Sequence, residues 1–137
     1  MTGSYLQAIR TQGHAANPFF QLMGITIQLL ETGQAALAMP IRSDMLNGEG
    51  WLQGGLFVAL GDEAMALALY TVLGESEHAA TVTESTSFLK GMQSGTAVAT
   101  GRVAHKGHRI AFMEAEVRNG VPTGEVLART SATFLIR

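Results

Sequence analysis

The stretch GGLFVALGDEAMALALYTVL, residues 54–73, decides the fold. It contains no proline, and its only charged side chains are the adjacent pair Asp62 and Glu63. The run is too long for a strand, so its length favours a helix. Because apolar residues cover most of its circumference, this helix must be packed on several sides. We therefore predict a long central helix over residues 54–73.

An apolar run of this length also fits a membrane span, which needs about 20 such residues. Two adjacent carboxylates at its centre would be costly in lipid, which argues against that reading. Residues 1–12 show no basic cluster followed by an apolar core, so no secretory signal is predicted. We expect a cytoplasmic protein without a membrane partner.

The composition fits one globular domain. The chain has 137 residues, 47% of them hydrophobic and 15% charged, so a single domain over residues 1–137 with a full core is expected. A formal net charge of −2 gives no positive field, so nucleic acid is not expected as a partner. The absence of cysteine excludes disulfides and thiolate metal sites.

The segments around the central run read as strands. Residues 4–11 fit a short helix, and Asn17-Pro18 is expected to end it. Short glycine-bearing links separate the later strands, which favours antiparallel neighbours. The result is an α+β fold in which a curved antiparallel sheet of five to six strands wraps the helix. The expected strands span residues 24–30, 34–41, 81–90, 96–105, 109–118 and 125–136.

Asp62 is the first candidate site residue. The residues three and four positions away on the helix are all apolar, and a carboxylate on such a surface is costly without a partner. A catalytic acid, a buried structural hydrogen bond and a solvated gap all remain open. Of the two acids, Glu63, one position further round the helix, is the better candidate for a group that is merely solvated.

Gly54 and Gly55 open the helix. Their missing side chains would let a ligand approach the unpaired N–H groups of the first turn, which suit an anion or a developing oxyanion. Glycines at such a junction also simply solve a backbone problem, and that reading stays open. Gly55 and Asp62 share one helix face but lie about 10 Å apart, so one carbonyl cannot contact both. Two antiparallel copies of the helix would bring them together, which predicts a site shared across an obligate homodimer.

Three groups of residues then follow in a fixed order: Asn47-x-x-Gly50-x-x-Gln53-Gly54-Gly55, Leu60-Gly61-Asp62, and Thr81 with Ser87-Phe88-Leu89. This ordered set resembles the hot-dog-fold acyl-CoA thioesterases, and most closely the phenylacetic-acid-degradation type. The resemblance runs from about Asn17 to the C-terminus. It implies a helix wrapped by an antiparallel sheet, and homodimers that pair into a dimer of dimers. The implied reaction is hydrolysis of a small-aryl or medium-chain acyl-CoA, with no cofactor because coenzyme A is part of the substrate.

The resemblance also implies roles for individual residues. Asp62 is the catalytic carboxylate, acting as general base or as nucleophile, and Gly55 offers its backbone N–H to the thioester oxygen. Asn47 helps to hold the substrate or water. The hydroxyl of Thr81 assists near the aspartate, with Thr83 as the alternative if the strand register differs by two residues.

Gln53 departs from the family pattern, which usually has histidine there. Glutamine can still donate a hydrogen bond to a carbonyl, but it cannot change charge near neutral pH. A positioning role therefore survives and a proton-transfer role does not. This departure leaves open a competing function, in which the protein binds an acyl-CoA as a sensor or carrier without turnover.

Basic residues gather around one glycine turn: Arg102, His105, Lys106, His108 and Arg109, with Gly107 between them. In the family this hairpin contacts the nucleotide end of coenzyme A, and such side chains suit phosphates. A solvated hairpin tip is the alternative. Gly54 and Lys90 are further candidates for substrate binding. No metal is predicted, since the two histidines lack a third ligand.

Other enzyme classes fit less well. The glycines at 48, 50 and 54 lack the spacing and the βαβ context of a dinucleotide loop. No Gly-x-Ser-x-Gly motif is present, which disfavours a serine hydrolase. A hydratase of the same fold would pair a histidine with an acid, and the central helix has no histidine.

Overall fold

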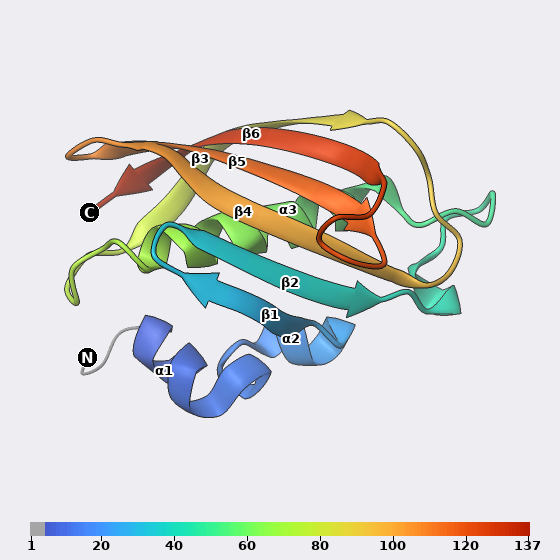
Figure 1. Cartoon of the computed structure of the whole chain (residues 1–137), viewed down its shortest axis with the longest axis horizontal. Coiled ribbons are helices and arrows are strands. Elements are labelled where there is room, and N and C mark those ends of the chain that lie inside the picture. Colours follow the sequence, from blue (N-terminus) through green and yellow to red (C-terminus); the bar gives the residue numbers. More distant parts are fainter. Residues whose placement is uncertain (1–4) are drawn as a thin grey trace.

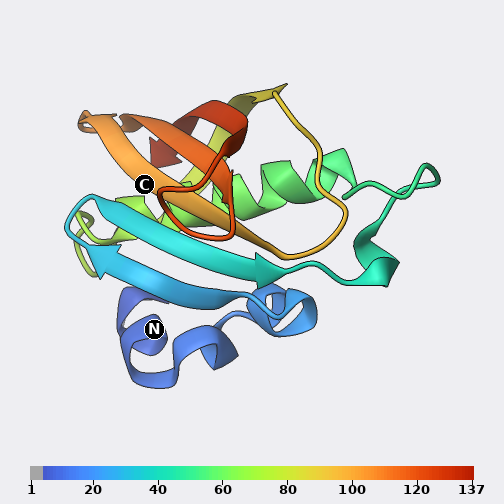
Figure 2. The ribbon, with the colours of Figure 1, turned by 45° about the vertical axis from the view of Figure 1, so that its right-hand side comes forward.

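The computed structural model describes residues 5–137. Six antiparallel strands form one sheet in the order β1-β2-β4-β5-β6-β3, and the long helix α3 lies along it (Figures 1 and 2). The predicted α+β arrangement of a helix wrapped by a curved sheet is confirmed. The elements are α1 (Tyr5–Gln12), the 3-10 turn η1 (Gly13–Ala16), α2 (Pro18–Met23), β1 (Thr26–Glu31), β2 (Gln34–Pro40), the 3-10 turn η2 (Ser43–Met45), α3 (Gly54–Tyr70), β3 (Ala79–Phe88), β4 (Thr96–Lys106), β5 (Ile110–Asn119) and β6 (Val126–Ile136).

Helix α3 buries one side against the sheet and leaves the other partly open. The side on the sheet is formed by Phe57, Leu60, Gly61, Ala64, Met65, Leu67, Ala68 and Leu69. The opposite side, which carries Asp62 and Glu63, is only half-buried in the single chain. The helix ends at Tyr70 and not at Leu73, because the N–H groups of residues 71–73 donate to carbonyls three residues back instead of four. The Thr71 hydroxyl donates to the Ala68 carbonyl at 2.6 Å and accepts from the Gly33 N–H.

Strand β4 approaches the helix backbone at Gly101. A Cβ built there would lie 2.5 Å from the carbonyl carbon of Ala64 and 2.5 Å from the nitrogen of Met65. Only a residue without a side chain fits this contact. Gly101 therefore sets how closely α3 sits on the centre of the sheet.

The short link after residue 90 does not join neighbouring strands, so the prediction that β3 pairs with β4 is wrong. β3 lies at the edge of the sheet and pairs only with β6, whereas β4 lies between β2 and β5. The N–H groups of Leu89 and Lys90 donate to the Leu127 carbonyl, so the chain stays on β6 as it leaves β3. Residues 89–95 then cross from the edge of the sheet to β4 (Figure 1). Seven extended residues span up to about 24 Å, which is enough to pass three strand spacings of about 4.8 Å each.

The prediction that Asn17-Pro18 ends the N-terminal helix is also wrong. Asn17 instead begins α2, because its Oδ1 accepts from the N–H groups of Phe19 and Phe20 at 3.0 and 3.2 Å. Proline at the first position of a helix loses no hydrogen bond. The predicted helix itself is present as α1, and Ser4 at its expected start lies outside the described residues. None of the helices among residues 5–137 has the length and apolar character needed to cross a bilayer.

Candidate active site

Asp62 receives a hydrogen bond from strand β3. The hydroxyl of Thr81 donates to Asp62 Oδ1 at 2.6 Å. A β-bulge between Thr81 and Thr83 makes this contact possible, since it leaves Val82 without a partner on β6. After the bulge Thr83 pairs with Thr133, which alternates with the buried, helix-facing Ala132 and Phe134, so Thr83 turns to the outer face, away from Asp62. The alternative assignment of Thr83 therefore does not fit this register.

Glu84 joins Asp62 on the same side of the sheet, and the sequence reasoning missed it. It pairs with buried Ala132 of β6 and so faces α3, where its carboxyl lies close enough to that of Asp62 for the two groups to influence each other's ionisation. Burial, followed by the contact with Asp62 and its charge, raises the pKa of Glu84 to about 7. In a regular strand Glu84 would face away from Thr81, and only the bulge brings both toward the helix. Neither residue type nor spacing in TVTEST signals this shift.

Glu63 is not merely solvated, and that prediction is wrong. Asn17 Nδ2 donates to Glu63 Oε1 at 3.2 Å and to the Tyr5 hydroxyl at 2.8 Å. Burial raises the pKa of Glu63, and the hydrogen bond from Asn17 partly offsets this. Burial also raises the pKa of Tyr5 to about 12. The N-terminal segment is thereby attached to α3 one residue from Asp62.

Gln53 caps the first turn of α3. Its side-chain Oε1 accepts from the N–H of Gly55 at 3.2 Å, so the N–H predicted to hold the thioester oxygen has a partner within the chain. Gly54 accommodates the ring of Phe88, since a Cβ there would lie 3.5 Å from Phe88 Cε1. A Cβ at Gly55 would meet no atom of the described residues within 4 Å. Gly55 is thus the glycine that is open to a ligand.

Asn47 shapes the loop that precedes the helix. Its Oδ1 accepts from the N–H groups of Glu49 and Trp51 at 2.9 and 3.1 Å, which closes the turn over residues 47–51. Asn47, Gln53, Gly54 and Gly55 therefore gather at the N-terminal end of α3. Asp62 follows about two turns later, so the single chain does not bring it to Gly55.

The basic turn lies at the other end of the molecule. The link between β4 and β5 and the loop before α3 occupy opposite ends in Figure 1. The His105 ring stacks on that of Phe112 with centroids 6.4 Å apart, and the Gly107 N–H donates to the Ile110 carbonyl at 2.8 Å. His108 and Arg109 line a cavity of about 370 Å³ with Glu77, Leu135, Ile136 and Arg137.

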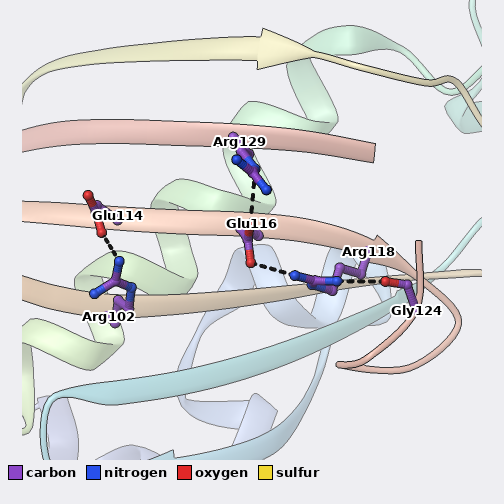
Figure 3. A network of polar contacts seen from close by, with 6 residues as sticks. All are labelled: Arg102, Glu114, Glu116, Arg118, Gly124 and Arg129. Carbon is purple, nitrogen blue, oxygen red and sulfur yellow. Dashed lines mark hydrogen bonds and ion pairs between the residues drawn. The ribbon is translucent and has the colours of Figure 1, made fainter. Parts of the chain in front are cut away.

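Two other basic side chains that the sequence suggested for phosphate binding, Lys90 and Arg102, form ion pairs within the chain. Lys90 contacts Glu125 at 3.1 Å. Arg102 pairs with Glu114 on the outer face of the sheet (Figure 3). Neither contributes a free positive charge to a phosphate site in the single chain.

The outer face of the sheet carries a network of alternating charges (Figure 3). Glu116 accepts from Arg118 at 2.8 Å and contacts Arg129 at 3.1 Å. The hydrogen bond from Arg118 lowers the pKa of Glu116. Because these side chains are partly or largely exposed to solvent, each pair contributes about 1 kcal/mol or less to stability. The network lies on the face opposite α3, away from Asp62. Over residues 5–137 no cluster of three or more histidine and acidic side chains forms that could hold a metal.

Comparison with known proteins gives a family match over most of the chain. The model of the thioesterase superfamily matches residues 49–126. A mutant thioesterase of Pseudomonas aeruginosa is 21% identical, with a TM-score of 0.82 over 99% of this chain and 95% of its own. A thioesterase of Haemophilus influenzae is 19% identical, with a TM-score of 0.83 over 100% of this chain and 92% of its own. A phenylacetic acid degradation-related protein of Ralstonia eutropha is 20% identical, with a TM-score of 0.85 over 96% of this chain and 99% of its own. At these identities the three structures establish likeness of fold.

Proposed function

The chain belongs to the thioesterase superfamily, and we propose that it hydrolyses an acyl-CoA thioester with Asp62 as the reacting carboxylate. The family match confirms the resemblance seen in the sequence and makes the protein a thioester hydrolase. The observation that carries the proposed role of Asp62 is its hydrogen bond with Thr81 at 2.6 Å on the open side of α3. Asp62 and Glu63 are the only charged residues of α3, and the Thr81 hydroxyl already orients the Asp62 carboxylate on this side of the helix.

Asp62 can react by either of two balanced routes. As a general base it takes a proton from water, the water oxygen bonds to the thioester carbon, and the C–S bond breaks. As a nucleophile it bonds to that carbon itself, and water then hydrolyses the mixed anhydride. Both routes end with a free acid and coenzyme A, whose sulfur takes up the proton. A single turnover in ¹⁸O-labelled water identifies the nucleophilic route when water opens the anhydride at the aspartyl carbon: the label then enters the Asp62 carboxyl and the released acid carries an oxygen from Asp62, whereas the general-base route puts the label in the released acid.

The oxyanion donor in this proposal is Gly55 of a second copy. Along one helix Gly55 is about 10 Å from Asp62, whereas an antiparallel pair of α3 helices brings them together. The half-buried side of α3 supports such a pairing, as do exposed apolar side chains on the edge strand and just beyond it. Val82, Phe88 and Leu89 are 56%, 56% and 58% exposed. The Gln53 side chain must leave the Gly55 N–H for the thioester oxygen to bind, which gives Gln53 control of access to this donor.

The proposed substrate carries a small-aryl or medium-chain acyl group. The solved relative related to phenylacetic acid degradation supports the aryl choice. The basic side chains His105, His108 and Arg109 are proposed to meet the phosphates of coenzyme A, together with the backbone of Gly107. No further cofactor is required, because a thioester already has a good leaving group.

A panel of aryl and aliphatic acyl-CoA substrates, read by release of free thiol, tests the proposal. We expect turnover of at least one member and a loss of about 10²-fold or more in Asp62→Asn. Glu63→Gln, next to it in the sequence, is the matched control and should keep most of the activity. Tight binding without thiol release across the panel would favour the sensor or carrier function instead.

The shared site is tested by mixing two inactive variants. Asp62→Asn removes the carboxylate, and Gly55→Val blocks the N–H. If the site is built from two chains, hybrid dimers of these variants regain one intact site in two. An active monomer in sedimentation, or no recovery in the hybrids, would contradict it.

A further inference from the structure

Glu84 is a half-buried glutamate beside the reacting carboxylate, and the proposed mechanism leaves it without a task. Its Oε2 is shielded from solvent and has no hydrogen-bond partner among the described residues. Its carboxyl lies on the helix side of β3 with Thr81, which bonds Asp62, and close enough to Asp62 for the two acids to influence each other's ionisation. Two ionised carboxylates have no proton to place between them, so these two groups can hydrogen-bond to each other only when one of them is protonated. A buried carboxylate oxygen without a donor is costly, and one proton removes that cost.

The backbone places Glu84 at this point by a specific feature. The bulge between Thr81 and Thr83 brings Thr81 and Glu84 to the helix side of β3 together. The Thr81 hydroxyl already donates to Asp62 Oδ1. A neutral Glu84 adds a second donor to the same carboxylate.

We propose that Glu84 is a positioning residue for Asp62: in its neutral form it donates its carboxyl O–H to the Asp62 carboxylate, so that two donors hold the reacting group and the pair carries one negative charge. This inference rests on the proposed role of Asp62. A carboxylate held by two donors loses little freedom when it reacts. When Glu84 ionises, the second negative charge repels Asp62 and opposes the oxyanion that develops on the substrate.

The charged surroundings of Glu84 are few. α3 brings Asp62 and Glu63, and Glu63 is engaged by Asn17. β5 brings Glu114, which is paired with Arg102 on the outer face. The helix-facing positions of β6, which is described over its whole length, carry Ala128, Thr130, Ala132 and Phe134 and no charge. Asp62 is therefore the neighbour that governs the ionisation of Glu84, and burial with this contact raises the pKa of Glu84 to about 7.

The proposal predicts a descending pH profile. We expect kcat/KM of the wild-type enzyme, after subtraction of enzyme-free hydrolysis, to fall about tenfold between pH 6 and pH 9. The midpoint belongs to the pair of carboxyls and not to one residue. Glu84→Gln supplies a permanently neutral side chain with an N–H donor. It should keep the pH 6 activity within about threefold and lose the fall near neutral pH.

Glu63→Gln is the matched control. It removes the other half-buried glutamate beside Asp62 and should leave the wild-type profile unchanged. A flat or rising wild-type profile, or a fall that persists in Glu84→Gln, would overturn the proposal. If Asp62→Asn is fully active, the proposed function fails. If Asp62→Asn is inactive while Glu84→Gln keeps the wild-type profile, only the role of Glu84 fails.

An infrared measurement on the wild-type protein keeps the proposal testable should Glu84→Gln not fold. A carboxylic-acid C=O band should be present at pH 6 and lost by pH 8, in both the wild-type protein and Glu63→Gln. Absence of a band that titrates in this range would refute a neutral Glu84.

Discussion

Gly101 offers the sharpest test of how α3 is held on the sheet. In Gly101→Ala the new Cβ would lie 2.5 Å from two backbone atoms of α3, at Ala64 and Met65. Ordinary contacts at such positions begin at 3.4 Å, so helix and strand must separate by about 0.9 Å. Neither side can yield by rotating a side chain, because both obstructing atoms belong to the backbone.

The size of the effect follows from this overlap. Overpacking a core costs about 1–3 kcal/mol, and a clash with backbone belongs at the upper end or above it. We expect Gly101→Ala to lose at least about 3 kcal/mol of unfolding free energy, or about 10 °C in melting temperature. Turnover should fall as well, since a misplacement of about 1 Å can cost about 10²-fold in rate.

Thermal and urea unfolding followed by circular dichroism at one protein concentration measures the loss. Gly48→Ala is the matched control, because a Cβ there meets no atom of the described residues within 4 Å, and its stability should change by about 0.5 kcal/mol or less. If Gly101→Ala unfolds within about 1 kcal/mol of the wild-type protein, β4 and α3 are not in the close contact described, and the reasoning is refuted.

Three further outcomes follow from hydrogen bonds and buried acids. Thr81→Ala should lower kcat, measured by thiol release, about tenfold, because it removes the hydroxyl that bonds Asp62. Thr81→Ser keeps that hydroxyl and Thr83→Ala changes the outer face, so both should stay near the wild-type rate. Equal losses at positions 81 and 83 would contradict the strand register. Asn17→Ala removes the N-cap of α2 and the hydrogen bond to Glu63, so the free energy of unfolding should fall by about 2 kcal/mol in thermal melts. An unchanged melting curve would show that the cap does not stabilise the protein. Because the pKa of Glu84 is raised from 4.5 to about 7, folding favours its protonated form and stability is lost as pH rises through this range. Glu84→Gln should therefore melt a few degrees above the wild-type protein at pH 8 and close to it at pH 5. A wild-type melting temperature above that of Glu84→Gln at pH 8 would contradict a raised pKa of Glu84.

The sequence predicted most of the fold because its strongest patterns are local. A long apolar run without proline reads as a helix whatever surrounds it, and the alternation of Met113, Ala115 and Val117 with charged residues reads as a half-buried strand. Strand pairing was predicted less well. The link over residues 89–95 looks like a hairpin, and only the bonds from Leu89 and Lys90 to Leu127 show that β3 stays beside β6.

Some residues of the candidate site could be predicted from the sequence, and others could not. Asp62 was evident because a carboxylate on an apolar helix face needs a reason, and Gly55 because it opens that helix. The partners of the two helix acids could not be read from the sequence. Glu63 is bonded to Asn17, which lies 46 residues earlier, and the strand residues at Asp62 lie 19 and 22 positions later.

By itself, the sequence determined the central helix, its single acidic pair and the strands that cover it, since periodicity and burial act within a few residues. Only the tertiary structure decided which groups meet at Asp62. A one-residue bulge at Val82 reverses the faces of β3, so it separates Thr83 from the site and adds Glu84 to it. Such a shift arises from the pairing of two whole strands, and no local pattern in either strand encodes it.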